Sequence, residues 1–218
     1  MTEPVNRGKS VRFACGALEL EGWLESVVGP DAVIISHPHP LYGGEMHNPV
    51  AVTLAAVYRQ LGYTTLRFNF RGVGASEGAY DDGRGESDDV RAAAAYLAGL
   101  GKTVTDLAGY SFGAWVNLRL NPPIATIRRQ LLVAPPVAFI EFGVIAESPP
   151  ELLVITGDDD RIAPPALLRK QVLDWHPHAR LFTLPDADHF YSGALERLAT
   201  LAATALAFQT DGPSSGAA

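Results

Sequence analysis

The sequence predicts an α/β fold in which a mostly parallel sheet carries helices on both faces. Short apolar runs rich in β-branched residues alternate with longer segments of helical character. The length of 218 residues suits one well-buried domain better than two. Apolar residues make up 47% and charged residues 19%, which is typical of a globular chain. We therefore expect a single domain over residues 1–209 and a flexible, Gly/Ser/Ala/Pro-rich tail over residues 210–218.

The expected elements follow from apolar runs and from the residues that start and stop them. Two short strands are expected between Val11 and Val28, with a turn near Gly16. Asn48 is expected to cap the first helix and Gly62 to end it. Further strands are expected at residues 31–36, 64–70, 106–109, 130–134, 151–156 and 180–184, and helices at residues 49–61, 86–100, 112–120, 164–175 and 194–208.

Charge and composition exclude several classes of function. The formal net charge is −7 and no run of Lys or Arg stands out, so we expect no nucleic-acid partner. No apolar stretch approaches the roughly 20 residues that cross a bilayer, and the polar start of the chain lacks a secretory pattern. The single cysteine, Cys15, allows no internal disulfide and is expected to be a small buried residue. These features together predict a cytoplasmic protein without a membrane partner.

The strongest local motif is G-x-S-x-G at residues 109–113, centred on Ser111. It falls between a predicted strand and a predicted helix, where a serine turned sharply outward needs small neighbours. The same turn would direct the N–H of Phe112 toward the hydroxyl, where it could stabilise an oxyanion. The motif therefore predicts a nucleophilic serine with Phe112 as an oxyanion-hole donor.

A serine hydroxyl needs a base, and His189 is the best-placed histidine. It follows the last predicted strand, so it should reach the same edge of the sheet as Ser111. The chain has six histidines, and the other five are His37, His39 and His47 near the first buried strand, and His176 and His178 in a turn.

The imidazole needs a carboxylate partner, and three aspartates follow the predicted strand at residues 151–156. The residues themselves leave open whether Asp158, Asp159 or Asp160 fills this role. The chain order of serine, aspartate and histidine is that of a hydrolase triad. A metal site built from the same groups is not expected, because no H-x-x-x-H or C-x-x-C pattern supports one.

A second oxyanion donor is expected from the loop at residues 37–44. Its two prolines carry no N–H, which leaves the N–H of His39 as the first choice and that of Leu41 as the alternative. The ring of His37 either orients this loop or is an ordinary buried structural histidine.

Taken together, these motifs resemble those of the short bacterial α/β-hydrolases related to dienelactone hydrolase and small carboxylesterases. The resemblance covers roughly residues 10–208 and implies an eight-stranded, mostly parallel sheet and an acyl-enzyme mechanism. It implies Asp160 as the triad acid and Arg71 as a brace for the oxyanion loop. The runs that carry it are SHPHPLYGG at 36–44, RFNFRGVGASEG at 67–78, GYSFG at 109–113, GDDDRIAP at 157–164 and DHFY at 188–191.

Two features refine the expected activity. Dienelactone hydrolases proper use a cysteine where this chain has Ser111, so ester chemistry is favoured. Only about 16 residues separate the strands ending near Ala134 and starting near Glu151, which is enough for a wall but not for a cap domain. We expect a hydrolase for small or short-chain carboxylic esters, with no cofactor and no metal. The alternatives are a thioesterase, a small-amide hydrolase or a non-catalytic binding module, and a homodimer is left open.

Overall fold

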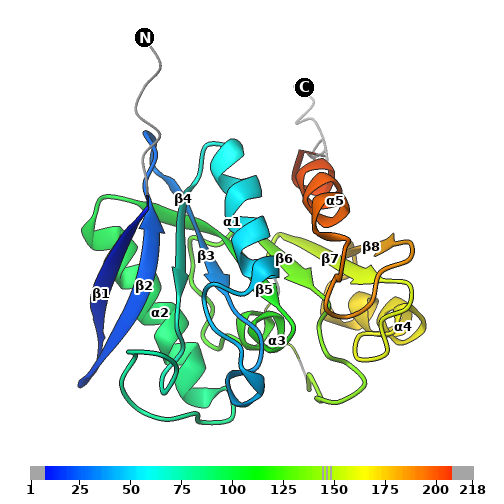
Figure 1. The fold of residues 1–218 in the computed structure, drawn as a ribbon, viewed down its shortest axis with the longest axis horizontal. Helices are drawn as coiled ribbons and strands as arrows, with labels where there is room; N and C mark the ends of the chain where they lie inside the picture. The colour runs from blue at the N-terminus through cyan, green and yellow to red at the C-terminus, as the bar shows by residue number, and fades with distance from the viewer. Residues whose placement is uncertain (1–7, 144, 146, 148, 208–218) are drawn as a thin grey trace, which may run out of the picture.

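Eight strands form one continuous sheet through the molecule (Figure 1). The computed structural model describes residues 8–143, 145, 147 and 149–207. The strands are β1 Lys9–Cys15, β2 Leu18–Glu25, β3 Asp31–Ser36, β4 Thr64–Phe68, β5 Thr103–Tyr110, β6 Arg129–Val133, β7 Glu151–Gly157 and β8 Arg180–Leu184.

The strand order is β1-β2-β4-β3-β5-β6-β7-β8. Strand β2 pairs antiparallel with both of its neighbours, and every other adjacent pair is parallel. The parallel register sets Ser36 of β3 beside Gly109 of β5, and Tyr110 beside Val133 of β6. The loops that follow β3, β5, β6, β7 and β8 therefore leave the sheet at one edge, where ligands bind in sheets of this type.

Helices cover both faces of this sheet. Helix α1 packs beside α5, while α2 packs against α3 and runs behind the sheet in Figure 1. Asn48 caps α1 as expected, since its side-chain oxygen accepts the N–H of Val50 at 3.0 Å. The helices are α1 Pro49–Gln60, α2 Arg84–Gly99, α3 Phe112–Leu118, α4 Pro165–Trp175 and α5 Leu195–Ala207, and a short 3-10 helix, η1, spans Pro40–Tyr42.

The central strands supply the hydrophobic core. All five residues of β4 are buried, as are all but the first residue of β3, β5, β6 and β7. Such runs are buried on both faces because helices lie on both sides. The expected architecture is confirmed, namely an eight-stranded, mostly parallel sheet with helices on both faces.

Several element boundaries differ from the sequence prediction by one to three residues, and two of the shifted starts have a clear structural cause. Strand β5 begins at Thr103, three residues earlier than expected, because its start pairs with the start of β3. Helix α2 begins at Arg84 rather than Glu86, because the carboxylate of Glu86 reaches back to accept the N–H of Gly83 at 2.8 Å. The expected tail, residues 210–218, lies outside the described residues, as does the last residue of the expected final helix.

Arg71 does not brace the oxyanion loop, which corrects that expectation. Its guanidinium instead binds the buried carboxylate of Asp89 in α2, with Nη2 to Oδ1 at 2.7 Å. Cys15 is buried as expected, and its Sγ lies 3.4 Å from the same carboxylate oxygen. Burial, followed by the charge of Asp89, raises the pKa of this thiol to about 11, so it stays protonated at neutral pH.

The described residues between β6 and β7 form a wall and not a cap. These residues, 134–143, 145, 147 and 149–150, contain no helix or strand. Pro136, Phe139 and Ile140 from this segment line the cleft described below. Among the helices in the described part of the chain, none is both long and apolar enough to cross a membrane.

Candidate active site

Ser111 stands at the turn between β5 and α3, in a backbone conformation that few non-glycine residues adopt. Its φ is 54° and its ψ is −117°. The turn is held because the Ser111 N–H donates to Val133 O at 2.9 Å and its carbonyl accepts from Ala114 N at 3.0 Å. Ser111 is only 7% exposed, and it lines the cleft described below.

The two glycines of the motif are required by close backbone contacts. A Cβ on Gly113 would lie 2.3 Å from the backbone oxygen of Ser36 in β3. A Cβ on Gly109 would lie 2.6 Å from the backbone nitrogen of Ala114. The packing of the strand-to-helix turn therefore requires glycine at both positions, as the sequence pattern indicated.

His189 lies in the loop after β8, and its ring meets the serine. The Nε2 atom is 3.1 Å from Ser111 Oγ, which is hydrogen-bonding distance. The Nδ1 atom on the other side of the ring is 2.8 Å from Asp160 Oδ2. Both His189 and Asp160 are nearly buried, at 6% and 2% exposure, so water does not screen their contact.

Asp160 is fixed by the loop after β7. Its Oδ1 atom accepts two backbone N–H groups, from Ile162 at 2.8 Å and from Ala163 at 2.7 Å. These bonds leave Oδ2 directed at the imidazole. The neighbouring Asp158 and Asp159 are exposed. Of the three aspartates that the residues alone left open, the structure brings Asp160 to His189.

Tyr110 contributes a contact that sequence reasoning missed. Its hydroxyl donates to the backbone carbonyl of His189 at 2.9 Å, within a buried environment. This bond ties the residue before Ser111 to the residue that carries the imidazole. A tyrosine at the end of a buried strand needs a polar partner for its hydroxyl, and that requirement was the available signal.

The loop after β3 is organised by the buried ring of His37. Its Nε2 accepts the N–H of Phe70 at 3.0 Å, and its Nδ1 donates to the carbonyl of Pro38 at 2.6 Å. Burial lowers the pKa of His37 to about 4, so the ring is neutral at physiological pH. His37 is fully buried with both ring nitrogens hydrogen-bonded to backbone groups, so these contacts fit both roles considered for it.

The two candidate donors in this loop differ in what their N–H groups bind. The N–H of Leu41 donates to Nδ1 of the His39 ring at 3.2 Å. The N–H of His39 has no protein acceptor among the described residues, and His39 lines the cleft. The N–H of Phe112 is the first of helix α3 and so lacks an acceptor within the helix.

These groups meet in a cleft of about 750 Å³ at the carboxyl edge of the sheet. Its walls come from the loops after β3, β5, β6, β7 and β8 and are mostly apolar or aromatic. The cleft is lined by Pro38, His39, Tyr42, Gly43, Gly44, Asn48, Tyr110, Ser111, Phe112, Pro136, Phe139, Ile140, Ile162, His189 and Phe190.

The remaining histidines lie away from this cleft. The ring of His47 packs against Trp23, and His176 ends helix α4 with its ring near that of His178. Within the described ranges, no group of three or more His, Cys, Asp or Glu side chains is arranged to hold a metal ion.

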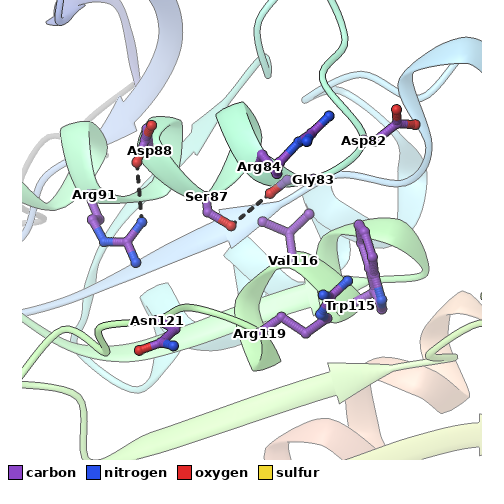
Figure 2. Close-up of a pocket in the computed structure, with 10 residues that line it drawn as sticks. All are labelled: Asp82, Gly83, Arg84, Ser87, Asp88, Arg91, Trp115, Val116, Arg119 and Asn121. Carbon is purple, nitrogen blue, oxygen red and sulfur yellow. Dashed lines mark hydrogen bonds and ion pairs between the residues drawn. The ribbon is translucent and has the colours of Figure 1, made fainter. Parts of the chain in front are cut away.

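A second hollow of about 280 Å³ lies between α2 and α3 (Figure 2). Its serine, Ser87, donates its hydroxyl to the carbonyl of Gly83 at 2.7 Å, and no histidine lines the hollow. Of its arginines, Arg91 pairs with Asp88 at 3.3 Å, and Arg119 lies over the ring of Trp115. This hollow lacks the groups for nucleophilic catalysis, so the larger cleft is the candidate active site.

Comparisons with known proteins identify the family of the chain. A sequence model of the Alpha/beta hydrolase family matches residues 33–146. The chain is 37% identical over 150 residues to an uncharacterized Rickettsia prowazekii protein, RP471; the match covers 66% of this chain and 63% of that protein. The chain therefore spans less than two thirds of the length of this curated relative.

Two solved structures resemble the whole fold. One is XC6422 from Xanthomonas campestris, described as an α/β serine hydrolase without a lid, with 32% identity, 94% and 96% coverage of the two chains and a TM-score of 0.83. The other is an α/β serine hydrolase homologue from Coxiella burnetii, with 31% identity, 95% and 100% coverage and a TM-score of 0.79.

Proposed function

Since this chain belongs to the alpha/beta hydrolase family and is a hydrolase of the α/β serine type, we propose that it cleaves small or short-chain carboxylic esters through an acyl-enzyme intermediate. The observation that carries the proposal is the continuous contact from Ser111 through His189 to Asp160, with distances of 3.1 and 2.8 Å. A hydroxyl, an imidazole and a carboxylate in this order make the serine nucleophilic.

In the first half of the reaction, Ser111 Oγ attacks the carbonyl carbon of the ester while His189 Nε2 takes the hydroxyl proton. The electron pair of the carbonyl moves onto its oxygen, which the N–H groups of Phe112 and His39 stabilise. When this intermediate collapses, the bond to the alcohol breaks, and the alcohol leaves with the proton from His189. The acyl group remains on Ser111.

In the second half, His189 takes a proton from water, and the resulting nucleophile attacks the acyl carbon. The bond to Ser111 Oγ then breaks, and the serine recovers its proton from His189. Asp160 holds the ring in the correct orientation throughout and stabilises the imidazolium that forms twice in each cycle. The products are one carboxylic acid and one alcohol.

Hydrolysis of 4-nitrophenyl acetate by purified protein tests the proposal. Ser111→Ala should lower kcat by at least about 10³-fold, with circular dichroism showing that the variant is folded. Retention of activity by the folded variant would place the nucleophile elsewhere. Acyl thioesters and small amides, assayed in parallel, distinguish the ester hydrolase from the two related hydrolases that share this machinery.

A further inference from the structure

The residues that line the cleft include no lysine, arginine, aspartate or glutamate among the described part of the chain. The polar groups in the cleft are those assigned above to catalysis, the side chains of His39 and Asn48, and tyrosine hydroxyls. Burial lowers the pKa of His39 below its ordinary value, which favours the neutral form of that ring. A substrate that enters this cleft therefore meets no cation that could pair with a carboxylate or phosphate.

Three aromatic side chains stand at the mouth of the cleft, each on a different loop. Tyr42 is 87% exposed, Phe139 74% and Phe190 67%, although all three line the cleft. We call these three residues the aromatic rim. Large exposed apolar side chains that gather around a concave site are typical of a site that binds an apolar ligand.

The negative net charge of the protein also disfavours anionic substrates. The chain carries a formal net charge of −7, and the exposed Asp158 and Asp159 follow the strand that leads to the cleft. An anionic substrate would lose water in the cleft without gaining a counter-charge, whereas an apolar chain would gain contact with the rim.

We propose that the cleft selects uncharged esters with an apolar acyl group over esters that bear a carboxylate, and that the aromatic rim determines this preference. The inference rests on the proposed function, because it names the substrate class of the same site. Tyr42, Phe139 and Phe190 are specificity-determining residues here, since they meet the acyl chain and not the reacting atoms.

A matched pair of substrates tests this selection. In 4-nitrophenyl pentanoate and mono-4-nitrophenyl glutarate the acyl chains have similar length, but the glutarate ends in a carboxylate. Each kcat/KM is divided by the rate constant for hydrolysis of the same ester by hydroxide, which corrects for intrinsic reactivity. The corrected kcat/KM for the pentanoate should exceed that for the glutarate by at least about 10-fold. Equal values for the two esters would overturn the inference.

Substitutions at the rim identify the residues responsible. Phe139→Ser and Phe190→Ser should lower kcat/KM for the pentanoate by about 3- to 10-fold, mainly through KM, and should lower kcat/KM for the acetate by a smaller factor. Leu173→Ser in α4 is the matched control, because Leu173 is also an exposed apolar residue, at 59%, but does not line the cleft. Equal losses on the acetate and the pentanoate, or losses in the control, would contradict a role of the rim in acyl selection.

A gain-of-function variant completes the test. Phe139→Arg places a cation at the rim and should raise the ratio of glutarate to pentanoate activity by about 2- to 5-fold. An unchanged ratio in an active variant would count against the proposal. Failure of the proposed function looks different, since acetate hydrolysis and phosphonate labelling of Ser111 would then both be absent in the unmodified protein.

Discussion

The hydroxyl of Tyr110 donates to the backbone carbonyl of His189 at 2.9 Å, which joins the end of β5 to the loop that carries the imidazole. Tyr110→Phe removes this bond and leaves a buried carbonyl without its partner. We expect the free energy of unfolding to fall by about 1–2 kcal/mol and kcat on 4-nitrophenyl acetate to fall by about 3- to 10-fold. Urea unfolding and steady-state kinetics measure the two effects.

Tyr191→Phe is the matched control for this prediction. Tyr191 is fully buried beside Tyr110, but its hydroxyl has no hydrogen-bond partner among the described residues. Removing an unpaired buried hydroxyl should leave the stability unchanged or slightly raised. If Tyr110→Phe behaved like Tyr191→Phe in both measurements, the bond to His189 would have no role in positioning the imidazole.

Asp160→Asn keeps the size of the side chain but removes its charge. The amide cannot accept from both the imidazole and the two backbone N–H groups, so His189 loses the orientation that its Nδ1 contact provides. The expected loss in kcat is between about 10²- and 10⁴-fold. Asp159→Asn, at the exposed neighbouring position, should leave kcat nearly unchanged, and a similar loss in both variants would contradict the assignment of Asp160.

The neutral ring of His37 predicts a dependence of stability on pH. Because its pKa is about 4 in the folded protein and near 6.5 when unfolded, the unfolded chain binds more protons between these values. The contribution of the neutral His37 ring to the free energy of unfolding is complete above pH 6.5 and is lost as the pH falls toward 4. Between pH 7 and pH 5 the loss should be about 2 kcal/mol.

Urea unfolding at both pH values measures this loss. His37→Gln, which cannot titrate, should have a pH dependence that is shallower by the same amount, whatever its absolute stability. If the variant and the unmodified protein lost the same stability between pH 7 and pH 5, His37 would not be the group responsible.

Gly113→Ala tests the packing of the turn that carries Ser111. The added Cβ would lie 2.3 Å from the backbone oxygen of Ser36 and 2.7 Å from that of His37, and backbone atoms in a central strand cannot move aside easily. We expect a loss of about 2–4 kcal/mol in the free energy of unfolding. Gly99→Ala, where an added Cβ meets nothing within 4 Å, should be neutral or stabilising by up to about 1 kcal/mol. Equal effects at the two glycines would contradict this account of the turn.

Much of this fold was predictable from the sequence because several strands, such as β3 and β7, are short, mostly apolar runs with Gly, Pro or Asp at or next to their ends. Strands β3 and β8 begin and end where the sequence predicted, and the cap of α1 is at Asn48 as expected. The start of β5 was predicted too late because Thr103 and its neighbours are ordered by pairing with β3, a partner about 70 residues away. Long-range pairing of this kind leaves little trace in local sequence.

Some residues of the site could likewise be predicted from local sequence, whereas others depend on contacts between distant segments. The turn at Ser111 follows from two glycines, and His189 from its place after the last strand, so both could be predicted. The choice of Asp160 over its neighbours depends on which N–H groups of a loop bind which oxygen, and that arrangement cannot be read from three adjacent aspartates. Arg71 was misassigned because its true partner, Asp89, lies in a helix 18 residues further along the chain.

The central claim is that the hydroxyl at position 111 is activated by the imidazole at position 189. Mass spectrometry of the folded protein after reaction with a fluorophosphonate measures this most directly. We expect one phosphonate adduct, located on the peptide that contains Ser111, and a rate of labelling that falls by at least about 10²-fold in His189→Ala. A folded protein that acquires no adduct, carries it on another residue, or reacts equally fast without the imidazole would contradict the account.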